Sequence, residues 1–188
     1  MLDKPYNEYQ LKSWSNYQQS NNNNAIDRIK IFKLKEYGGK NKTLLDVGSN
    51  NGEFPRELSS DFNKIYAVEP FVEPISDLPN NVTWIKKTFK EFTNENIEKY
   101  DVVLSLAMTI QAKENDNLSE EEIAERFFNL VKSDGILLYE TQKLAKRIRN
   151  QEHVNNMVKA FTSFFGDYIK SGNARAAGAR KFYIFKKK

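Results

Sequence analysis

The sequence has no cysteine and a single histidine among its 188 residues. The absence of cysteine excludes disulfide bonds and cysteine-based zinc sites, and one histidine argues against a transition-metal site built by the protein. No apolar run approaches the roughly 18 residues that a membrane-spanning helix needs. The N-terminus also lacks the basic, apolar and small-residue order of a secretion signal. We therefore expect a cytoplasmic protein that binds neither a metal ion nor a membrane.

The chain is long enough for one complete hydrophobic core, and its 39% hydrophobic and 29% charged residues are typical of a globular protein. Residues 1–20 are aromatic and polar, and four consecutive asparagines follow at positions 21–24. We expect residues 1–24 to form a flap or lid over a site in the main domain, residues 25–188. A helix simply docked on that domain is the alternative.

The net charge of +4 conceals an asymmetry along the chain. Residues 1–140 carry 17 Lys and Arg against 23 Asp and Glu, whereas residues 141–188 carry 12 against 2. A strongly basic last quarter on an acidic body predicts that an anionic partner meets the C-terminal segment. The alternative is a solvated basic tail, which is how residues 186–188, three lysines, are interpreted here.

Apolar patterning predicts alternating strands and helices. Strands are expected at residues 43–47, 64–70, 82–85, 100–107, 136–140, 168–169 and 181–185, and helices at residues 25–37, 119–131 and 143–165. The last two strands have no helix between them. The sequence therefore predicts an α/β fold with a mostly parallel sheet that ends in a C-terminal antiparallel hairpin.

Residues 43–54, TLLDVGSNNGEF, join a buried strand to a glycine loop and the start of a helix. Asp46 lies near the end of the strand, and the loop contains Gly48 and Gly52. Such a loop lets the backbone approach a ligand closely and directs helix N–H groups toward it. The following strand ends on Glu69, where an acid commonly accepts ribose hydroxyls. The spacing differs from the dinucleotide pattern Gly-x-Gly-x-x-Gly, so NAD is not expected to bind. An ordinary strand-to-helix turn is the alternative.

This stretch resembles motif I of the class I S-adenosylmethionine (SAM)-dependent methyltransferases, acid-x-Gly-x-Gly-x-Gly. Asp46, Gly48 and Gly52 match, and Asn50 replaces the middle glycine. Asparagine enters the left-handed backbone region at modest cost, so the turn can be kept. The resemblance covers about residues 25–188. It implies a Rossmann-like seven-stranded sheet, methyl transfer as the activity, SAM as the cofactor and S-adenosylhomocysteine as the product.

The resemblance also implies a set of cofactor contacts. Glu69 would accept both ribose hydroxyls, and the end of the fourth strand would lie beside the transferring methyl group. Many relatives carry an acid after the third strand for the adenine amino group; this sequence has none there, so Thr88 or a backbone carbonyl would take that role, with Phe89 stacking on adenine. The expected cofactor-binding residues are Asp46, Gly48, Ser49, Asn50, Gly52, Glu69, Pro70, Thr88, Phe89, Ser105 and Leu106.

Methyl transfer from a sulfonium is an in-line displacement. A hydroxyl acceptor needs a general base, whereas an anionic oxygen needs only cationic positioning. The candidate catalytic residues are Glu140, which could instead be a hydrogen-bonding anchor, and His153, for which a surface position is the alternative. The expected substrate-binding residues are Tyr17, Lys143, Arg147, Arg175 and Arg180.

A weaker, local resemblance connects four short segments with the family that methylates the 5′-terminal phosphate of RNA. These segments are residues 16–17, 100–106, 140–142 and 181–185. The leading hypothesis is a SAM-dependent O-methyltransferase for an anionic acceptor, such as a phosphate-bearing small molecule or a glycan precursor. An RNA methyltransferase is the alternative that the basic last quarter supports, although the chain has no RNA-binding signature. A non-catalytic partner subunit with the same fold is the third hypothesis.

Overall fold

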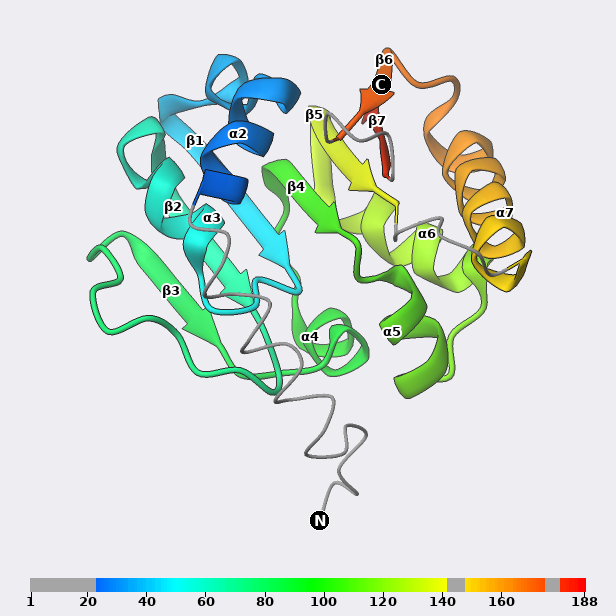
Figure 1. The fold of residues 1–188 in the computed structure, drawn as a ribbon, viewed down its shortest axis with the longest axis horizontal. Helices are drawn as coiled ribbons and strands as arrows, with labels where there is room; N and C mark the ends of the chain where they lie inside the picture. Colours follow the sequence, from blue (N-terminus) through cyan, green and yellow to red (C-terminus); the bar gives the residue numbers. More distant parts are fainter. Residues whose placement is uncertain (1–22, 142–147, 175–179) are drawn as a thin grey trace.

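The computed structural model describes residues 23–141, 148–174 and 180–188. In these ranges the chain forms seven strands and the helices that cover them (Figure 1). The strands are β1 (Gly39–Val47), β2 (Phe62–Val68), β3 (Val82–Ile85), β4 (Tyr100–Leu106), β5 (Val131–Glu140), β6 (Lys170–Asn173) and β7 (Lys181–Lys186). The helices are α2 (Asn23–Phe32), η1 (Leu34–Tyr37), α3 (Glu53–Leu58), η2 (Ser59–Asp61), α4 (Phe89–Glu95), α5 (Thr109–Asn115), α6 (Glu120–Leu130) and α7 (Ile148–Phe165).

The strands form one sheet in the order β3-β2-β1-β4-β5-β7-β6. Strands β1 to β5 are parallel to one another, and β7 pairs antiparallel with both β5 and β6. The predicted mostly parallel, seven-stranded sheet with a C-terminal antiparallel hairpin is therefore confirmed. The strand order reverses between β1 and β4, and in open α/β sheets ligands bind beyond the carboxyl ends of the strands at such a point.

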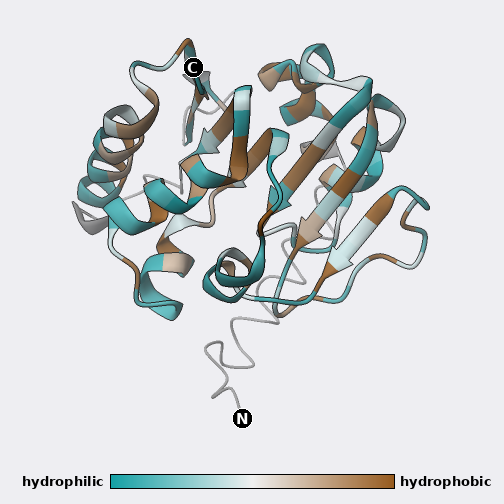
Figure 2. Cartoon of the chain, turned by 180° about the vertical axis from the view of Figure 1, so that it is seen from behind, coloured by the Kyte–Doolittle hydropathy of each residue, from teal (hydrophilic) through white to brown (hydrophobic). Residues whose placement is uncertain are grey.

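Helices cover both faces of the sheet, and each face has its own hydrophobic cluster. On one face α2, η1 and α3 pack on the strands through Ala25, Ile29, Phe32, Leu34, Phe54 and Leu58. On the other face α4 to α7 contribute Phe89, Phe92, Ala112, Ile123, Phe127, Met157, Phe161 and Phe165. Seen from behind, the strands are largely hydrophobic and the helices carry hydrophilic residues on their outer sides (Figure 2). Burial from both sides explains why the central strands read as continuous apolar runs.

Several element boundaries differ from those expected. The helix predicted over 25–37 is interrupted at Lys33, whose φ of 59° is left-handed, and a 3₁₀ turn follows. Helices α4 and α5 were not predicted, although Thr88 and Glu91 form a complete capping box at the start of α4. The strand placed at residues 168–169 begins instead at Lys170, although the Ile169 N–H already donates to the carbonyl of Ile184 on β7 at 2.8 Å.

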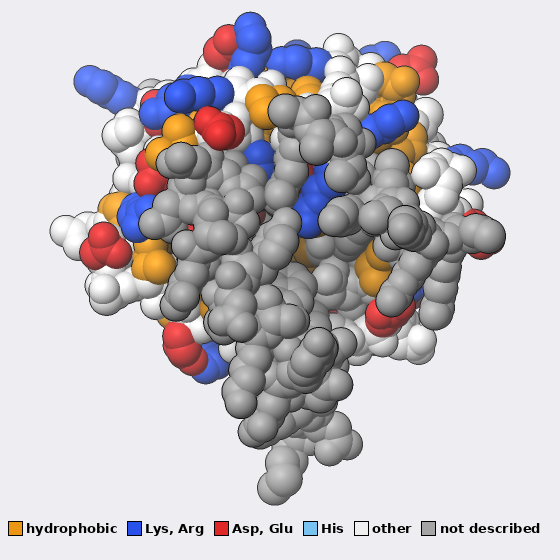
Figure 3. Space-filling model, in the orientation of Figure 1, with side chains coloured by type: hydrophobic (Ala, Val, Ile, Leu, Met, Phe, Trp, Pro, Cys, Tyr) orange, Lys and Arg blue, Asp and Glu red, His pale blue; other side chains and the backbone are white. Residues whose placement is uncertain are grey.

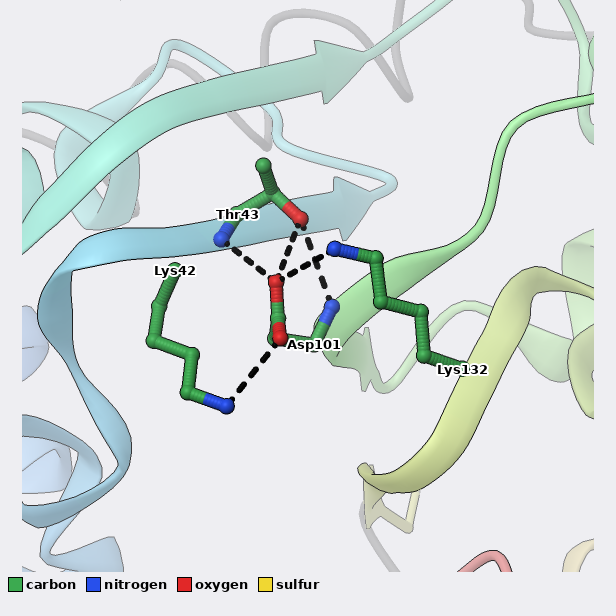
Figure 4. A network of polar contacts seen from close by, with 4 residues as sticks. All are labelled: Lys42, Thr43, Asp101 and Lys132. Carbon is green, nitrogen blue, oxygen red and sulfur yellow. Dashed lines mark hydrogen bonds and ion pairs between the residues drawn. The ribbon is translucent and has the colours of Figure 1, made fainter.

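The amino-terminal ends of the central strands are joined by Asp101 on β4 (Figure 4). Its Oδ2 accepts hydrogen bonds from the backbone N–H of Thr43 at 2.9 Å, from the Thr43 hydroxyl at 2.9 Å and from Lys132 Nζ at 2.8 Å. Its Oδ1 accepts from Lys42 Nζ at 3.1 Å. These donors hold the pKa of Asp101 well below its usual range although partial burial opposes them. The network ties β1, β4 and β5 at the edge remote from their carboxyl ends.

Of the three C-terminal lysines that were interpreted as a solvated tail, Lys186 and Lys188 are exposed, but Lys187 is not. Lys187 is buried, and its Nζ donates to the carbonyl oxygens of Phe128 at 2.7 Å and Val131 at 3.0 Å. It also lies 3.9 Å from the centre of the Phe128 ring. A cation at the carboxyl end of α6 satisfies carbonyls that the helix itself leaves unpaired.

The proposed flap, residues 1–24, falls almost entirely outside the described residues, so the division at residue 24 stays a prediction. Over the described ranges, no helix has both the length and the apolar character needed to cross a bilayer. In the same ranges, no group of three or more His, Asp or Glu side chains is arranged to hold a metal ion.

Candidate functional site

The loop between β1 and α3 contains three residues with positive φ. Gly48, Asn50 and Gly52 have φ values of 75°, 54° and 90°. Asn50 therefore adopts the left-handed conformation expected where it replaces the middle glycine of the motif. The backbone N–H groups of Gly48 and Ser49 both donate to the carbonyl of Val68, at 2.8 and 3.1 Å, which ties the loop to the end of β2.

Both glycines are also required by close packing. A Cβ at Gly48 would lie 2.9 Å from Cβ of Met108, which follows β4. A Cβ at Gly52 would lie 3.1 Å from a methyl group of Leu78 and 3.3 Å from the Trp84 ring. The loop is therefore fixed between the segments that leave the neighbouring strands, where any other residue would be both strained and crowded.

Glu69 follows β2 and fixes the same loop from its other side. Its Oε2 accepts the backbone N–H of Asn50 at 3.1 Å, and its Oε1 accepts the N–H groups of Phe71 at 3.0 Å and Val72 at 3.4 Å. Burial raises the pKa of this carboxyl, and the three backbone donors act in the opposite direction. A carboxylate offers about four lone-pair sites, so Oε2 retains capacity for a further donor.

Asp46 is 1% exposed, and its Oδ1 has no hydrogen-bond partner among the described residues. Burial raises the pKa of its carboxyl to about 7, and the nearby Arg28 guanidinium limits that increase. An orphaned buried acceptor is costly, so it marks a position prepared for a donor from outside the protein. A ligand ammonium group fits this position.

Arg28 on α2 reaches the end of β5, where it forms an ion pair with Oε2 of Glu140. Arg180 approaches Oε1 of the same carboxylate at 3.5 Å. Glu140 is fully buried, and the sheet register places it on the same face as Asp46. The Arg28 guanidinium also lies 4.7 Å from the centre of the Phe54 ring on α3. Two cations from opposite ends of the chain thus meet one carboxylate at the carboxyl edge of the sheet.

Arg28 was not identified from the sequence. It lies inside the helix predicted over residues 25–37 and was assigned no role, because nothing local indicates that Glu140, 112 residues later, lies beside it. Only the pairing of β1, β4 and β5 brings the two together.

The other expected cofactor residues lie at the same edge of the sheet in different environments. Pro70 is partly buried directly after Glu69, and Leu106 is partly buried at the end of β4. Ser105 is fully buried, and its Oγ has no hydrogen-bond partner among the described residues. Thr88 caps α4 by accepting the Glu91 N–H. Phe89 is 4% exposed and its ring stacks on Phe127 with centroids 4.6 Å apart, so its stacking surface is already used in the core.

His153 lies inside the protein rather than on its surface. It is 5% exposed, with Nδ1 at 3.0 Å from Oε1 of Glu120 and Nε2 at 3.0 Å from the Thr109 hydroxyl. Burial lowers its pKa, which Glu120 partly offsets. The polar sequence around His153 pointed to an exposed helix face because its partners come from two other helices. Of the expected substrate-binding residues, Arg180 is described; Tyr17, Lys143, Arg147 and Arg175 lie outside the described residues.

The strand order, the glycine loop after β1 and the acid after β2 together define a class I SAM-dependent methyltransferase. The model of a family described as "Methyltransferase domain" matches residues 17–167, and the chain belongs to this family. The chain is therefore a SAM-dependent methyltransferase with SAM as its cofactor, as the sequence predicted. No curated protein sequence matches it significantly.

Solved structures show the same fold at low sequence identity. The N-methyltransferase NodS from Bradyrhizobium japonicum WM9 is 12% identical and superposes with a TM-score of 0.65, over 85% of this chain and 93% of that chain. NodS has also been solved with S-adenosylhomocysteine. A TehB-like SAM-dependent methyltransferase from Corynebacterium glutamicum is 13% identical, with a TM-score of 0.62 over 96% and 97% of the two chains. The plantazolicin methyltransferase BamL is 12% identical, with a TM-score of 0.64 over 96% and 91%.

Proposed function

We propose that the chain transfers the methyl group of SAM to an oxygen atom of an anionic acceptor, such as a phosphate-bearing small molecule or a glycan precursor. The observation that carries the proposal is the convergence of Arg28 and Arg180 on Glu140 at the carboxyl edge of the sheet. The Arg180 side chain is 20% exposed at this edge, and its guanidinium fork has the geometry that pairs with a phosphate or carboxylate oxyanion. The basic last quarter of the chain supports the same partner.

The residues that would hold the cofactor are those around the glycine loop. Asp46 would accept the ammonium group through its orphaned Oδ1, and Glu69 would accept a ribose hydroxyl through the capacity left on Oε2. Gly48, Ser49, Asn50 and Gly52 would shape the backbone against the cofactor, with Pro70, Ser105 and Leu106 at its borders. When bound, SAM supplies an electrophilic methyl group on a sulfonium centre.

In this arrangement Arg180 positions the acceptor oxyanion and Glu140 anchors Arg180 and Arg28. Glu140 has its two oxygens directed at two guanidinium groups and is fully buried, which favours the anchoring role over proton transfer. Arg180 would align the acceptor oxygen with the methyl group that bound SAM would supply, and the sulfur would leave with the electron pair of the broken carbon–sulfur bond. An oxygen that is already anionic gives up no proton, so alignment supplies the catalysis.

Transfer of label from SAM to matched pairs of acceptors tests the proposal, for example a sugar phosphate against the free sugar. We expect transfer to the phosphorylated member. Replacing Arg180 with Ala should lower kcat/KM about ten- to a hundredfold, because a charge-assisted contact is worth about 1.5–3 kcal/mol. Arg180→Lys should restore only part of the rate, since an ammonium group lacks the guanidinium fork. Lys181→Ala is the matched control, because Lys181 is adjacent and exposed.

Equal transfer to neutral acceptors, with no effect of Arg180→Ala, would contradict an anionic substrate. The similar structures do not indicate an acceptor, since their names include an N-methyltransferase, a putative rRNA-methylase and a plantazolicin methyltransferase. RNA remains the second candidate. On the described part of the face in Figure 3, basic and acidic side chains are interspersed rather than gathered in one basic patch. Retention on generic RNA that weakens steeply with salt would favour RNA over a small molecule.

A further inference from the structure

Thr141, which directly follows β5, extends the pairing of β5 with β7 by one residue. The ladder of the two strands ends with Glu140 opposite Phe182. Beyond it, the N–H of Thr141 donates to the carbonyl of Lys181 at 2.9 Å. In a regular antiparallel pair the return bond would go from the Lys181 N–H to the backbone carbonyl of Thr141. Here the Thr141 hydroxyl accepts that N–H at 3.0 Å, so a side chain takes the place of a carbonyl.

Arg180 is therefore held from both sides. The residue after it, Lys181, is bonded to Thr141 through its N–H and its carbonyl. The carbonyl of Arg180 accepts the N–H of Ala174, which is fully buried, at 2.9 Å. The Arg180 guanidinium lies 3.5 Å from Glu140 Oε1. Two consecutive residues at the end of β5 thus hold Arg180 and Lys181, Glu140 through side-chain charge and Thr141 through the backbone of its partner.

The position of the Arg180 backbone determines where its charge can be used. An arginine side chain has several rotatable bonds and loses much of its freedom when it is fixed. A guanidinium pairs with an oxyanion through a planar fork, which requires a defined orientation. A displacement of about 1 Å at a positioning group can cost a large part of catalysis. Thr141 is fully buried and Lys181 bonds to it with backbone groups alone, so this contact fixes the chain whatever side chain position 181 carries.

We infer that Thr141 is a positioning residue for acceptor binding: its N–H and hydroxyl fix the backbone at Arg180–Lys181 and thereby place the Arg180 guanidinium where it meets the acceptor oxyanion. The inference rests on the proposed function, because only the pairing of Arg180 with an anion gives this position its role. Thr141 acts through Arg180 and takes no part in the displacement. The role requires a hydroxyl at position 141, so serine should preserve it and valine, which is close to threonine in shape, should abolish it.

Inorganic phosphate is the probe for the anion position, because it carries the charge of the proposed acceptor without the rest of its structure. Its Kd for the complex of the protein with S-adenosylhomocysteine is measured by NMR titration at constant ionic strength. Thr141→Val should bind phosphate about two- to tenfold more weakly than the wild type, the range that one neutral hydrogen bond spans. Thr141→Ser should bind it like the wild type. Both variants should keep the wild-type affinity for S-adenosylhomocysteine, which a general loss of structure would lower.

A double-variant cycle in the transfer assay shows whether Thr141 acts through Arg180. With the phosphorylated acceptor, Thr141→Val should lower kcat/KM about two- to tenfold in the wild-type background. In an Arg180→Ala background the same substitution should have no further effect, because the group that Thr141 positions is gone. Thr83→Val is the matched control and should change neither value, because Thr83 is an exposed residue of β3, the edge strand remote from β7.

The amide of Lys181 reports the hydrogen bond itself. It should exchange with solvent more slowly in the wild type and in Thr141→Ser than in Thr141→Val. Equal exchange in all three, wild-type phosphate binding by Thr141→Val, or an undiminished effect of Thr141→Val in the Arg180→Ala background would overturn the inference and leave the proposed function intact. A wild-type protein that binds phosphate no more tightly than Arg180→Ala does would instead reject the proposed function, and the inference with it.

Discussion

Asn50 donates its backbone N–H to Glu69 Oε2 at 3.1 Å, so the glycine loop after β1 and the acid after β2 are directly bonded to each other. Glu69 also accepts from Phe71 and Val72 with its other oxygen. One carboxylate therefore shapes the loop and faces the position proposed for the ribose. The two motifs of the cofactor site act as one unit, and a change in either should affect both.

Replacement of Glu69 tests this double role. Glu69→Ala should weaken SAM binding by about 2–4 kcal/mol, because it removes the ribose acceptor and leaves three backbone N–H groups without their partner. Calorimetric titration with SAM measures the loss. Glu73→Ala is the control: Glu73 lies on the same connection but forms only an exposed ion pair with Lys86. Unchanged affinity in Glu69→Ala would place the ribose elsewhere.

The buried acid Asp46 predicts proton release on cofactor binding. Its pKa of about 7 means that the carboxyl is largely protonated at pH 6, whereas an ammonium partner requires the ionised form. Binding of SAM at pH 6 should therefore release up to one proton, and binding at pH 8 almost none. Calorimetry in buffers with different ionisation enthalpies measures this number. Asp46→Asn should abolish the release and lower the affinity, and equal release at both pH values would show that Asp46 does not meet the ammonium group.

The same residue should reduce the stability of the cofactor-free protein. A carboxyl whose pKa is raised on folding loses stabilisation as pH rises from its unfolded value of about 3.9 to about 7. Asp46→Asn should remove this slope and raise the free energy of unfolding at pH 7.5 by about 0.5–2 kcal/mol. Thermal unfolding across pH 4–8 provides the measurement. A less stable variant at pH 7.5 would mean that the carboxylate already has a stabilising partner in the protein.

The sequence predicted the parts of this molecule that depend on local patterns. The apolar strands, the glycine loop, the capping box at Ser119 and the acid at Glu69 are each readable within a few residues, and together they specify the fold and the cofactor class. The helix α4, which was missed, also has a local signal in the sequence, since Thr88 and Glu91 have capping-box spacing. It was overlooked because Thr88 was considered only as an adenine contact.

The remaining features depend on contacts between distant segments, which no local pattern encodes. Lys187 was interpreted as part of a solvated tail, but the position of β7 places it beside the end of α6. His153 resembled a surface residue because its partners belong to α5 and α6. Arg28 is joined to Glu140 only by the assembled sheet. In each case a polar side chain is buried, and its partner is more than 30 residues away in sequence.

The ion pair between Arg28 and Glu140 predicts strong energetic coupling between α2 and β5. Removing one partner of a buried pair leaves an uncompensated charge, so Arg28→Met and Glu140→Gln should each cost about 3–5 kcal/mol of unfolding free energy. The double variant should cost less than the sum by about 1–3 kcal/mol. Denaturant unfolding of the four proteins measures the coupling. Additive losses would indicate that each side chain is stabilised mainly by other groups, such as Arg180 for Glu140 and Phe54 for Arg28.

Asp101, at the opposite edge of the sheet, predicts sensitivity to acid that is independent of the cofactor site. Its pKa is held below the usual range by Lys132, Thr43 and Lys42, so its stabilisation is complete above about pH 4 and is lost as pH falls further. Asp101→Asn should lower the free energy of unfolding at pH 7 by about 1–2 kcal/mol, because the amide keeps the shape but loses the charge-assisted bonds. The difference from wild type should shrink as the pH falls from about 4 toward 2.

The matched control for Asp101 is Asp134→Asn. Asp134 also pairs with a lysine, Lys186, at 2.9 Å, but its side chain is 84% exposed, so water screens the pair and its loss should cost less than about 1 kcal/mol. Asparagine also tolerates the positive φ of 61° at that position. Because Asp101 lies at the amino-terminal edge of the sheet, Asp101→Asn should leave SAM affinity unchanged at pH 7.5. A weakened affinity there, with the fold intact, would show that the two edges of the sheet are coupled through β1 and β4.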